Sequence, residues 1–380
     1  MKFSKLPSAD VQVMLGFSIF LLVAVITFGL VRSGILEPPE IQQPDRLTPI
    51  SNDAAVDSKH APIEVGVYIE NNYLFSADDK TFYAVGQVWL NWPESVEKNR
   101  KQQGISPETW LNWINQVDRW DSKLEPVYPN PIRMADGRYH QSFRFSGQFY
   151  VDELDFRSYP FHSIHLPLVL ELSETIAHGS TPHMTLVADV AGSAPGEYID
   201  IMGYKTTGFH VTTANHDYGT HMGLKGNATQ EAYHMRQIAF VTTYQQSVNA
   251  TLLTLFLPLL VVMSLVMMSP ILSATLWDIR LGIPPMALLT LIFLQQTYKT
   301  TLPELPYATY LDLIYNICYL INLMLFTLFL WASNRLHQAP EELRPEVTRM
   351  IDRVDLFALI SLTLMLIIMS LVQWYVLPGN

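Results

Sequence analysis

Long apolar runs and short alternating segments divide this chain into two kinds of sequence. Between residues 63 and 243, apolar and polar residues alternate in short stretches separated by turn residues, which is typical of half-buried strands. Five apolar runs elsewhere are long enough, or nearly so, to span a bilayer: residues 13–31, 252–268, 283–298, 311–331 and 356–376. The pattern predicts a membrane protein with one sizeable domain outside the membrane.

The alternating region predicts an antiparallel β-sandwich of the immunoglobulin-like kind. Strands are expected at residues 64–69, 81–92, 139–151, 163–172, 183–190, 208–213 and 232–243. Residues 106–119 are the exception, because Ser106 can cap a helix that begins at Pro107 and places Trp110 and Trp113 on one face. We therefore expect one short helix among the strands.

These elements divide the chain into five segments. They are a cytoplasmic N-terminus at 1–12, a membrane anchor at 13–31, a proline-rich linker at 32–62, the sandwich domain at 63–248 and a four-helix domain at 249–380. The four helices are expected at about residues 252–268, 281–298, 308–331 and 356–377. The first span has a long apolar core with no small-residue cleavage site after it, which favours an uncleaved anchor over a cleaved signal peptide.

Basic residues beside the spans set the expected orientation. They cluster before the first span and between the last two: Lys2, Lys5, Arg335, Arg344, Arg349 and Arg353. We therefore expect both segments inside, and the sandwich domain and the C-terminus outside. This arrangement predicts a multi-pass protein of the plasma (inner) membrane whose soluble domain faces outward.

Composition narrows the classes of function. The chain is 49% hydrophobic and 16% charged, and its net charge of −11 argues against a nucleic-acid partner. The acidic excess either attracts cations or serves ordinary solubility. The single cysteine, Cys318, lies inside a span, so no intrachain disulfide can form. The sequence contains no nucleophile motif, phosphate loop or zinc-hydrolase motif, so we expect neither an enzyme nor a bound cofactor.

The third apolar run carries a stripe that suggests a pore. Taken every three or four residues, one helix face carries Asp278, Gly282, Met286, Leu289, Phe293 and Gln296. A ring of such helices would form a pore with an acidic mouth and a hydrophobic constriction, whereas the alternative is a membrane helix packed on its neighbours. Pro284 and Pro285 remove backbone donors and are expected to kink the helix. Such a break would rotate the stripe and bring Leu288 or Ile292 to the axis.

Two short motifs resemble those of a known family. The segment LDFRSYPFHSIHLPLVLEL at residues 154–172 closely resembles the signature loop of pentameric ligand-gated ion channels, in the prokaryotic branch that lacks the bracketing cysteines of animal Cys-loop receptors. The segment TLPELPYATY at 301–310 resembles the loop between the second and third channel helices of that family. Leu257 and Pro258 resemble the proline step of its first channel helix. The resemblance covers about residues 63–377, and the span at 13–31 is outside the usual pattern.

The resemblance implies a β-sandwich ligand-binding domain followed by four membrane helices, of which the second lines the pore. Asp278 falls where the inner acidic ring of cation-selective members lies, two residues before a basic position that is Arg280 here. Leu289 falls at the central hydrophobic gate, and Phe293 lies one turn above it. These residues are therefore expected to select and gate the passing ions.

The resemblance also implies a coupling region. Its residues are expected on the first β-turn, at the tip of the signature loop and after the pore helix: Asp78, Asp79, Tyr159, Pro160, Phe161, Pro303 and Pro306. The tip is expected to press on the loop that holds the two prolines, so that a signal at the outer domain moves the helices.

Three departures from the family's pattern stand out. His162 replaces a usual aspartate, and Gln246 stands near a usual arginine, so Asp79 is expected to lack its ordinary partner. The segment GIPPM at 282–286 replaces the small hydroxylated residues of the inner pore. Carbonyl groups freed by the prolines would line a wet pore, or the substitution marks a member that does not conduct.

Candidate ligand-binding residues are aromatic and histidine side chains on outer loops. They are Tyr204, Tyr218, Tyr233, His178 and His183. A tyrosine can hold an ammonium group by a cation–π contact, although a tyrosine at a sandwich edge has the same appearance in sequence. His216 and His221 share a loop and are weak candidates for a divalent metal or for titration. Their spacing forms no tight cluster, so no metal is expected.

These observations together predict a homopentameric channel gated by a small ligand or by protons. One narrow-faced helix per chain cannot enclose a pore without symmetry. Asp278 makes cations the expected permeant ions. The expected partners are four further copies, the lipid bilayer, the permeant ions and the gating ligand. The competing hypothesis is a non-conducting membrane receptor or scaffold of the same fold.

Overall fold

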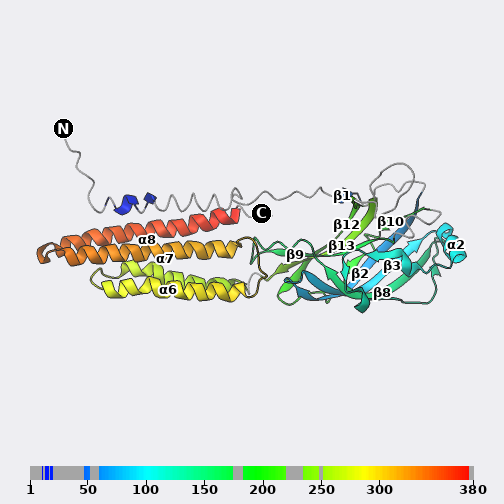
Figure 1. The fold of residues 1–380 in the computed structure, drawn as a ribbon, viewed down its shortest axis with the longest axis horizontal. Helices are drawn as coiled ribbons and strands as arrows, with labels where there is room; N and C mark the ends of the chain where they lie inside the picture. Colours follow the sequence, from blue (N-terminus) through cyan, green and yellow to red (C-terminus); the bar gives the residue numbers. More distant parts are fainter. Residues whose placement is uncertain are drawn as a thin grey trace, which may run out of the picture. The chain divides into compact units, whose positions relative to one another are not determined.

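The computed structural model describes residues 11, 13–16, 18–19, 47–51, 60–173, 183–219, 234–247 and 251–375. The chain forms two compact units. The β-rich unit comprises Ile41–Asp155 and Ser163–Ser247, and the helical unit includes Phe156–His162 and Val248–Asn380 (Figure 1).

The β-rich unit contains two sheets. The first sheet has the order β1 (Leu47–Ile50), β12 (Tyr204–Asp217), β13 (His234–Gln246), β9 (Ser163–Leu172) and β4 (Leu111–Trp113). The second sheet has the order β10 (His183–Ala188), β2 (His60–Ser76), β3 (Thr81–Trp92), β8 (Tyr139–Tyr150) and β5 (Gln116–Val117). Three short strands pair outside this order: β11 (Ala194–Pro195) pairs with β2, and both β6 (Lys123–Pro126) and β7 (Ile132–Arg133) pair with β8. Among the described strands, pairing is antiparallel except that β10 and β11 run parallel to β2.

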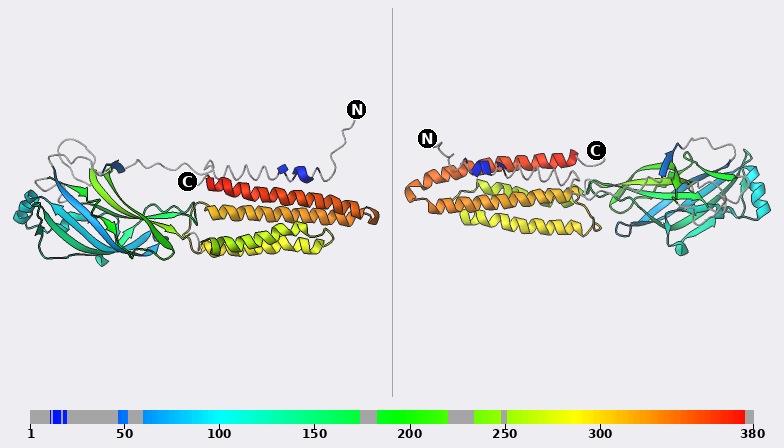
Figure 2. Two further views of the ribbon diagram at one scale, coloured as in Figure 1. Left: turned by 180° about the vertical axis from the view of Figure 1, so that it is seen from behind. Right: turned by 45° about the horizontal axis from the view of Figure 1, so that its top comes forward.

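The inner faces of the two sheets share one apolar core. Along β3 and β9, buried and less buried residues alternate with the two-residue period of a pleated strand. The buried residues of both sheets belong to a single hydrophobic cluster, which includes Val67, Phe82 and Leu168. The predicted sandwich is confirmed as a β-sandwich-like pair of sheets, visible from two further directions in Figure 2.

The expected helix at residues 106–119 is wrong. Its first residues form a single 3₁₀ turn, Pro107–Trp110, and the chain then enters β4, which pairs with β9. Trp110 packs edge-on against Trp92 at 5.0 Å, and Trp113 lies 5.0 Å from Phe145. Trp110 enters the sandwich core from the 3₁₀ turn and Trp113 from β4, and this burial overrides the local helical pattern.

The structure has a helix that the pattern did not predict. It is α2, Glu94–Gln103, which precedes the 3₁₀ turn, and a second 3₁₀ turn follows at Arg119–Asp121. Helix α2 is polar on most of its surface, so it has no clear apolar stripe to reveal it. It is anchored by the buried Glu97 carboxylate, which accepts hydrogen bonds from the Trp92 indole at 3.0 Å and from Arg100 at 2.8 Å.

The predicted linker at 32–62 contains structure. Strand β1 lies within it and pairs with β12, while β2 already begins at His60. Only residues 47–51 and 60–62 of the predicted linker lie among the described residues. Strand β1 is the edge strand of its sheet, which is where a strand containing a proline is tolerated.

The helical unit contains four helices long and apolar enough to cross a membrane, within the part of the chain that the structure describes. They are Leu252–Ile271, Trp277–Lys299, Tyr310–Gln338 and Glu341–Val372. Their elements are the π-helical turn Leu252–Phe256, α5 (Leu257–Met268), the 3₁₀ turn Ser269–Ile271, α6 (Trp277–Lys299), α7 (Tyr310–Gln338), the 3₁₀ turn Glu341–Leu343 and α8 (Arg344–Tyr375). The chain is therefore a membrane protein, as its hydropathy predicted.

The last helix differs from its predicted bounds, and the predicted N-terminal anchor is described only in part. The last helix begins at Arg344, earlier than expected, because its polar first turns carry no hydropathy signal. In the expected N-terminal anchor at 13–31, only residues 13–16 and 18–19 are described, and they are helical. The remainder of the anchor lies outside the described residues.

Candidate pore helix and coupling loop

Helix α6 has a buried face and an exposed face within the subunit. It packs against α7 and against α5, and Figure 1 labels α6 and α7 in the helical unit. The buried face carries Arg280, Pro284, Ala287, Leu291 and Tyr298. The exposed face carries all six residues of the predicted stripe: Asp278, Gly282, Met286, Leu289, Phe293 and Gln296. The arrangement leaves the stripe available to another molecule or to solvent.

The exposed stripe differs from an ordinary lipid-facing surface at its two ends. Its middle is apolar and strongly exposed, with Met286 at 75%, Leu289 at 56% and Phe293 at 63%. Its ends are polar, because Asp278 opens the first turn and Gln296 lies in the last turn. The uncovered face of α6 therefore has an apolar middle between a carboxylate and an amide.

Pro284 and Pro285 lie inside α6, which is one continuous helix from Trp277 to Lys299, and the predicted kink stays a prediction. Pro284 is buried and Pro285 is exposed. Each proline removes one backbone donor, and the helix continues on both sides of the pair. The stripe residues are exposed both before and after the two prolines.

The N-terminal part of α6 is bonded to α8 by a buried ion pair. Arg280 Nη2 lies 2.6 Å from Asp355 Oδ2, and the two side chains are 2% and 3% exposed. The guanidinium also lies 4.4 Å from the centroid of the Phe329 ring on α7. Asp355 did not emerge from the sequence as a candidate, although an acid inside a membrane helix is itself a signal of a specific partner.

The C-terminal end of α6 is bonded to α7 by a network around Asp312. This carboxylate accepts hydrogen bonds from Tyr298 at 2.5 Å and from Gln295 at 3.0 Å, and it pairs with Lys299 at 3.1 Å. It also forms a capping box with Thr309, which starts α7. Asp312 was not among the predicted site residues, although its position three residues after a threonine matches this capping pattern.

The tip of the signature loop belongs to the helical unit. The Tyr159 ring stacks on Tyr298 of α6 at 6.0 Å, and the Phe161 ring stacks on Phe256 at 5.9 Å. Pro160 follows Tyr159 through a cis peptide bond. The loop thus contacts helices through aromatic rings.

The same loop is bonded to the segment that joins α6 and α7. The Phe156 amide donates to Tyr307 Oη at 3.0 Å, and the Tyr310 amide donates to the Arg157 carbonyl at 2.8 Å. Pro303 is half-buried and Pro306 is exposed in this segment. The sequence placed the contact on the two prolines, whereas the hydrogen bonds reach the tyrosines beside them.

The other predicted coupling residues lie in the β-rich unit. Asp78 and Asp79 are exposed on the turn between β2 and β3. The Asp79 carboxylate accepts a hydrogen bond from the Ser76 hydroxyl at 2.9 Å, and the hydroxyl in turn accepts from the Asp79 amide at 3.2 Å. These bonds fix the shape of the turn.

Of the predicted ligand-binding residues, Tyr204, Tyr218 and His183 lie among the described residues. Tyr204 begins β12 and lies edge-on to Phe75 at 6.2 Å. Tyr218 donates to the buried Glu171 carboxylate at 2.8 Å and lies 4.3 Å from the His216 ring, so its hydroxyl is held by the fold. His183 begins β10, and Tyr233, His178 and His221 lie outside the described residues. Among the residues that the structure describes, no group of three or more metal-ligating side chains forms.

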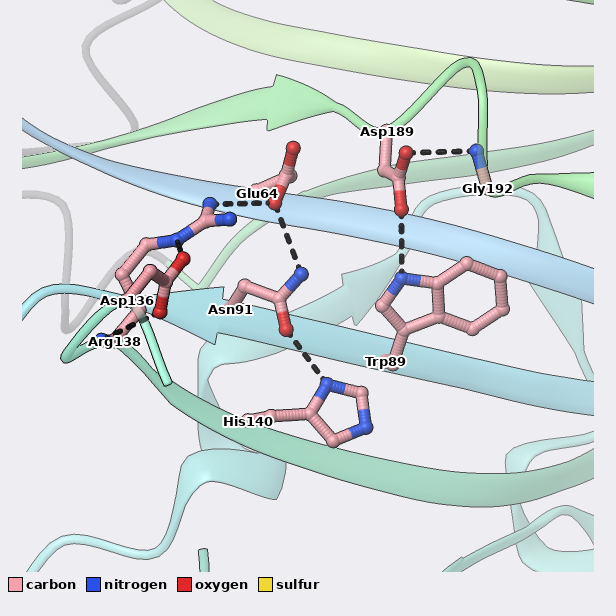
Figure 3. A network of polar contacts seen from close by, with 8 residues as sticks. All are labelled: Glu64, Trp89, Asn91, Asp136, Arg138, His140, Asp189 and Gly192. Atoms are coloured by element: carbon pink, nitrogen blue, oxygen red, sulfur yellow. Dashed lines mark hydrogen bonds and ion pairs between the residues drawn. The ribbon is translucent and has the colours of Figure 1, made fainter. Parts of the chain in front are cut away.

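A polar network on β2, β3 and β8 was not expected from the sequence (Figure 3). Asn91 accepts at 2.6 Å from His140 Nδ1 and donates at 2.9 Å to Glu64, which Arg138 contacts at 2.8 Å. Nearby, the Trp89 indole donates to Asp189 at 3.1 Å. The alternating pattern places these residues on one sheet face but does not reveal which of them pair.

His140 makes the network sensitive to pH. Burial lowers the pKa of its imidazole below the usual value of about 6.5. The unfolded chain therefore binds the proton first as the pH falls, so the free energy of unfolding decreases below about pH 6.5. Urea unfolding of the full-length protein, followed by tryptophan fluorescence between about pH 7.5 and 5.5, measures this loss. We expect His140→Gln to reduce the dependence on pH, and an unchanged dependence would contradict this role of His140.

Comparison of the sequence with protein-family models and with curated proteins finds no match. The layout, a β-rich domain followed by four apolar helices, is compatible with that of pentameric ligand-gated ion channels.

Proposed function

We propose that the chain forms a homopentameric ion channel of the pentameric ligand-gated class, in which five copies of α6 line the pore. The observation that carries the proposal is the exposed stripe of α6, which has an acidic start, an apolar middle and a polar end. In a closed ring of identical subunits, the five copies of this stripe would face one another around a central axis.

In this proposal each part of the stripe has a role in ion passage. Rings of Asp278 attract cations at the inner mouth. Rings of Leu289 and Phe293 keep the narrow part dry, because an ion that enters would lose its hydration shell. The soluble domain faces outward from the plasma (inner) membrane, and a small ligand or protons act on it.

The signature loop supplies the route from signal to pore in the proposal. Its tip stacks on α6 through Tyr159 and is hydrogen-bonded to the α6–α7 segment at Tyr307. The same loop continues into β8 on one side and β9 on the other. A change in the strands therefore pulls on side chains that contact the pore helix.

The pentamer itself is the first test. We expect the detergent-extracted protein to have five times the subunit mass of 43.3 kDa and to show fivefold rings in averaged particle images. Mass measurement of the intact assembly decides the question. A stable monomer or dimer would contradict the proposal, because a single stripe cannot enclose a pore.

A further inference from the structure

Helix α6 carries three charged side chains, and both of its positive ones are paired with carboxylates from other helices. These three are Asp278, Arg280 and Lys299. Arg280 pairs with Asp355 of α8, and Lys299 pairs with Asp312 of α7. Helix α6 alone has one net positive charge, but with its two carboxylate partners it has one net negative charge.

The Arg280 charge is held inside the helical bundle. Its side chain is 2% exposed, lies on the buried face of α6 and stacks over Phe329. The field of a charge close to an opposite charge falls off quickly, so the pair presents little net potential to the exposed stripe. Asp355 thereby holds the guanidinium in place and compensates its charge.

The Lys299 charge is compensated at the other end of the helix. Its ammonium lies 3.1 Å from Asp312 Oδ1, an atom that also accepts hydrogen bonds from Tyr298 and Gln295. Because the Lys299 side chain is 47% exposed, water screens this pair more than the inner one. The outer pair is therefore expected to have the smaller effect.

Asp278 is the charge that remains. It is exposed at the start of α6, and within the described part of the chain it forms no ion pair. We propose that Asp355 and Asp312 are specificity-determining residues, which compensate Arg280 and Lys299 within each subunit and so leave Asp278 to make the exposed stripe attractive to cations. The inference rests on the proposed function, because the stripe meets ions only if it lines a pore.

The local potential on the stripe can be measured without any ion current. A cysteine is introduced by Gly282→Cys, where an added Cβ meets nothing within 4 Å, and the native Cys318 is buried. Its rates of reaction with a cationic and an anionic methanethiosulfonate reagent are compared in the full-length assembly. The ratio of the two rates reports the sign of the potential.

The inner pair is tested by a cycle of charge changes. We expect Asp355→Asn to lower the cation-to-anion rate ratio several-fold, in the same direction as Asp278→Asn. Arg280→Gln should raise the ratio, and the double variant Arg280→Gln with Asp355→Asn should restore it. A purely structural role would not move the ratio in opposite directions. If Asp355→Asn fails to fold, Arg280→Gln and the double variant still decide the matter.

The outer pair and the control complete the experiment. With the probe at Gln296→Cys, Asp312→Asn is expected to lower the ratio by a smaller factor. The control is Asp352→Asn, which removes the same charge from an exposed position of α8 and should leave the ratio unchanged. Ratios that stay unchanged in Asp355→Asn and in Arg280→Gln would overturn the inference even in a conducting channel. The expected ratios in a protein that passes no current would overturn the proposed function instead.

Discussion

Replacing Leu289 by serine is expected to produce a channel that leaks in the absence of ligand. The Leu289 side chain is 56% exposed within the subunit and lies in the apolar middle of the stripe. A ring of five hydroxyl groups would wet this part of the pore and favour the open state. A change of about 1.4 kcal/mol in the open–closed balance shifts the open fraction tenfold, and we expect at least about that increase in leak.

Two matched leucines make this prediction specific. Leu291 is fully buried on the opposite face of α6, so Leu291→Ser should lower the yield of pentamer, at a cost of about 2–5 kcal/mol, without adding leak. Leu288 is exposed beside the stripe, and its serine variant should leave the leak unchanged. Pentamer recovery and leak current are measured together. Normal recovery of Leu289→Ser with unaltered current, or a leak in Leu288→Ser alone, would remove Leu289 from the gate.

Replacing Asp312 by alanine is expected to destabilise the helical unit strongly. The change removes the acceptor for Tyr298, Gln295 and Lys299, and it deletes the capping box that starts α7. Leaving the buried Tyr298 hydroxyl without its acceptor costs about 1–3 kcal/mol, and losing the cap of α7 costs about 1 kcal/mol more. The measurement is the thermal midpoint of the detergent-solubilised assembly.

The chain offers a graded series for this second prediction. Asp312→Asn keeps an acceptor for the tyrosine and for the capping bond, so it should recover part of the loss. Asp352→Ala removes a carboxylate from an exposed position of α8 and should change stability by less than about 0.5 kcal/mol. Equal midpoints for Asp312→Ala and Asp352→Ala would show that the network contributes no stability.

Secondary structure could be predicted from the sequence where the hydrophobic period was strong. The prediction failed where tertiary contacts decided which structure a segment adopts. Strands such as β8 and β9 and the four membrane helices follow directly from alternation and from apolar length. Residues 106–119 did not, because Trp110 and Trp113 fit a helical face and a sandwich core equally well. The contacts with Trp92 and Phe145 decide between the two structures, and the spacing of residues in the sequence does not reveal these contacts.

The candidate site could be predicted as a set of residues but not as a set of contacts. Helical spacing alone placed the six stripe residues on one face, and this face is exposed in the subunit. The partners of Arg280 and of Tyr159 come from segments far away in the chain, so no local pattern could identify Asp355 or Tyr298. The role of the stripe in ion conduction stays a prediction.

Single-channel recording from the purified assembly in planar bilayers tests the central claim most directly. Recordings would cover a range of pH and candidate ligands, with Leu289→Ser included to bypass an unknown ligand. The account predicts discrete unitary currents that prefer cations, with a weaker preference in Asp278→Asn. Intact pentamers that pass no current in any condition, for the native chain and for Leu289→Ser alike, would contradict it and favour a receptor or scaffold that does not conduct.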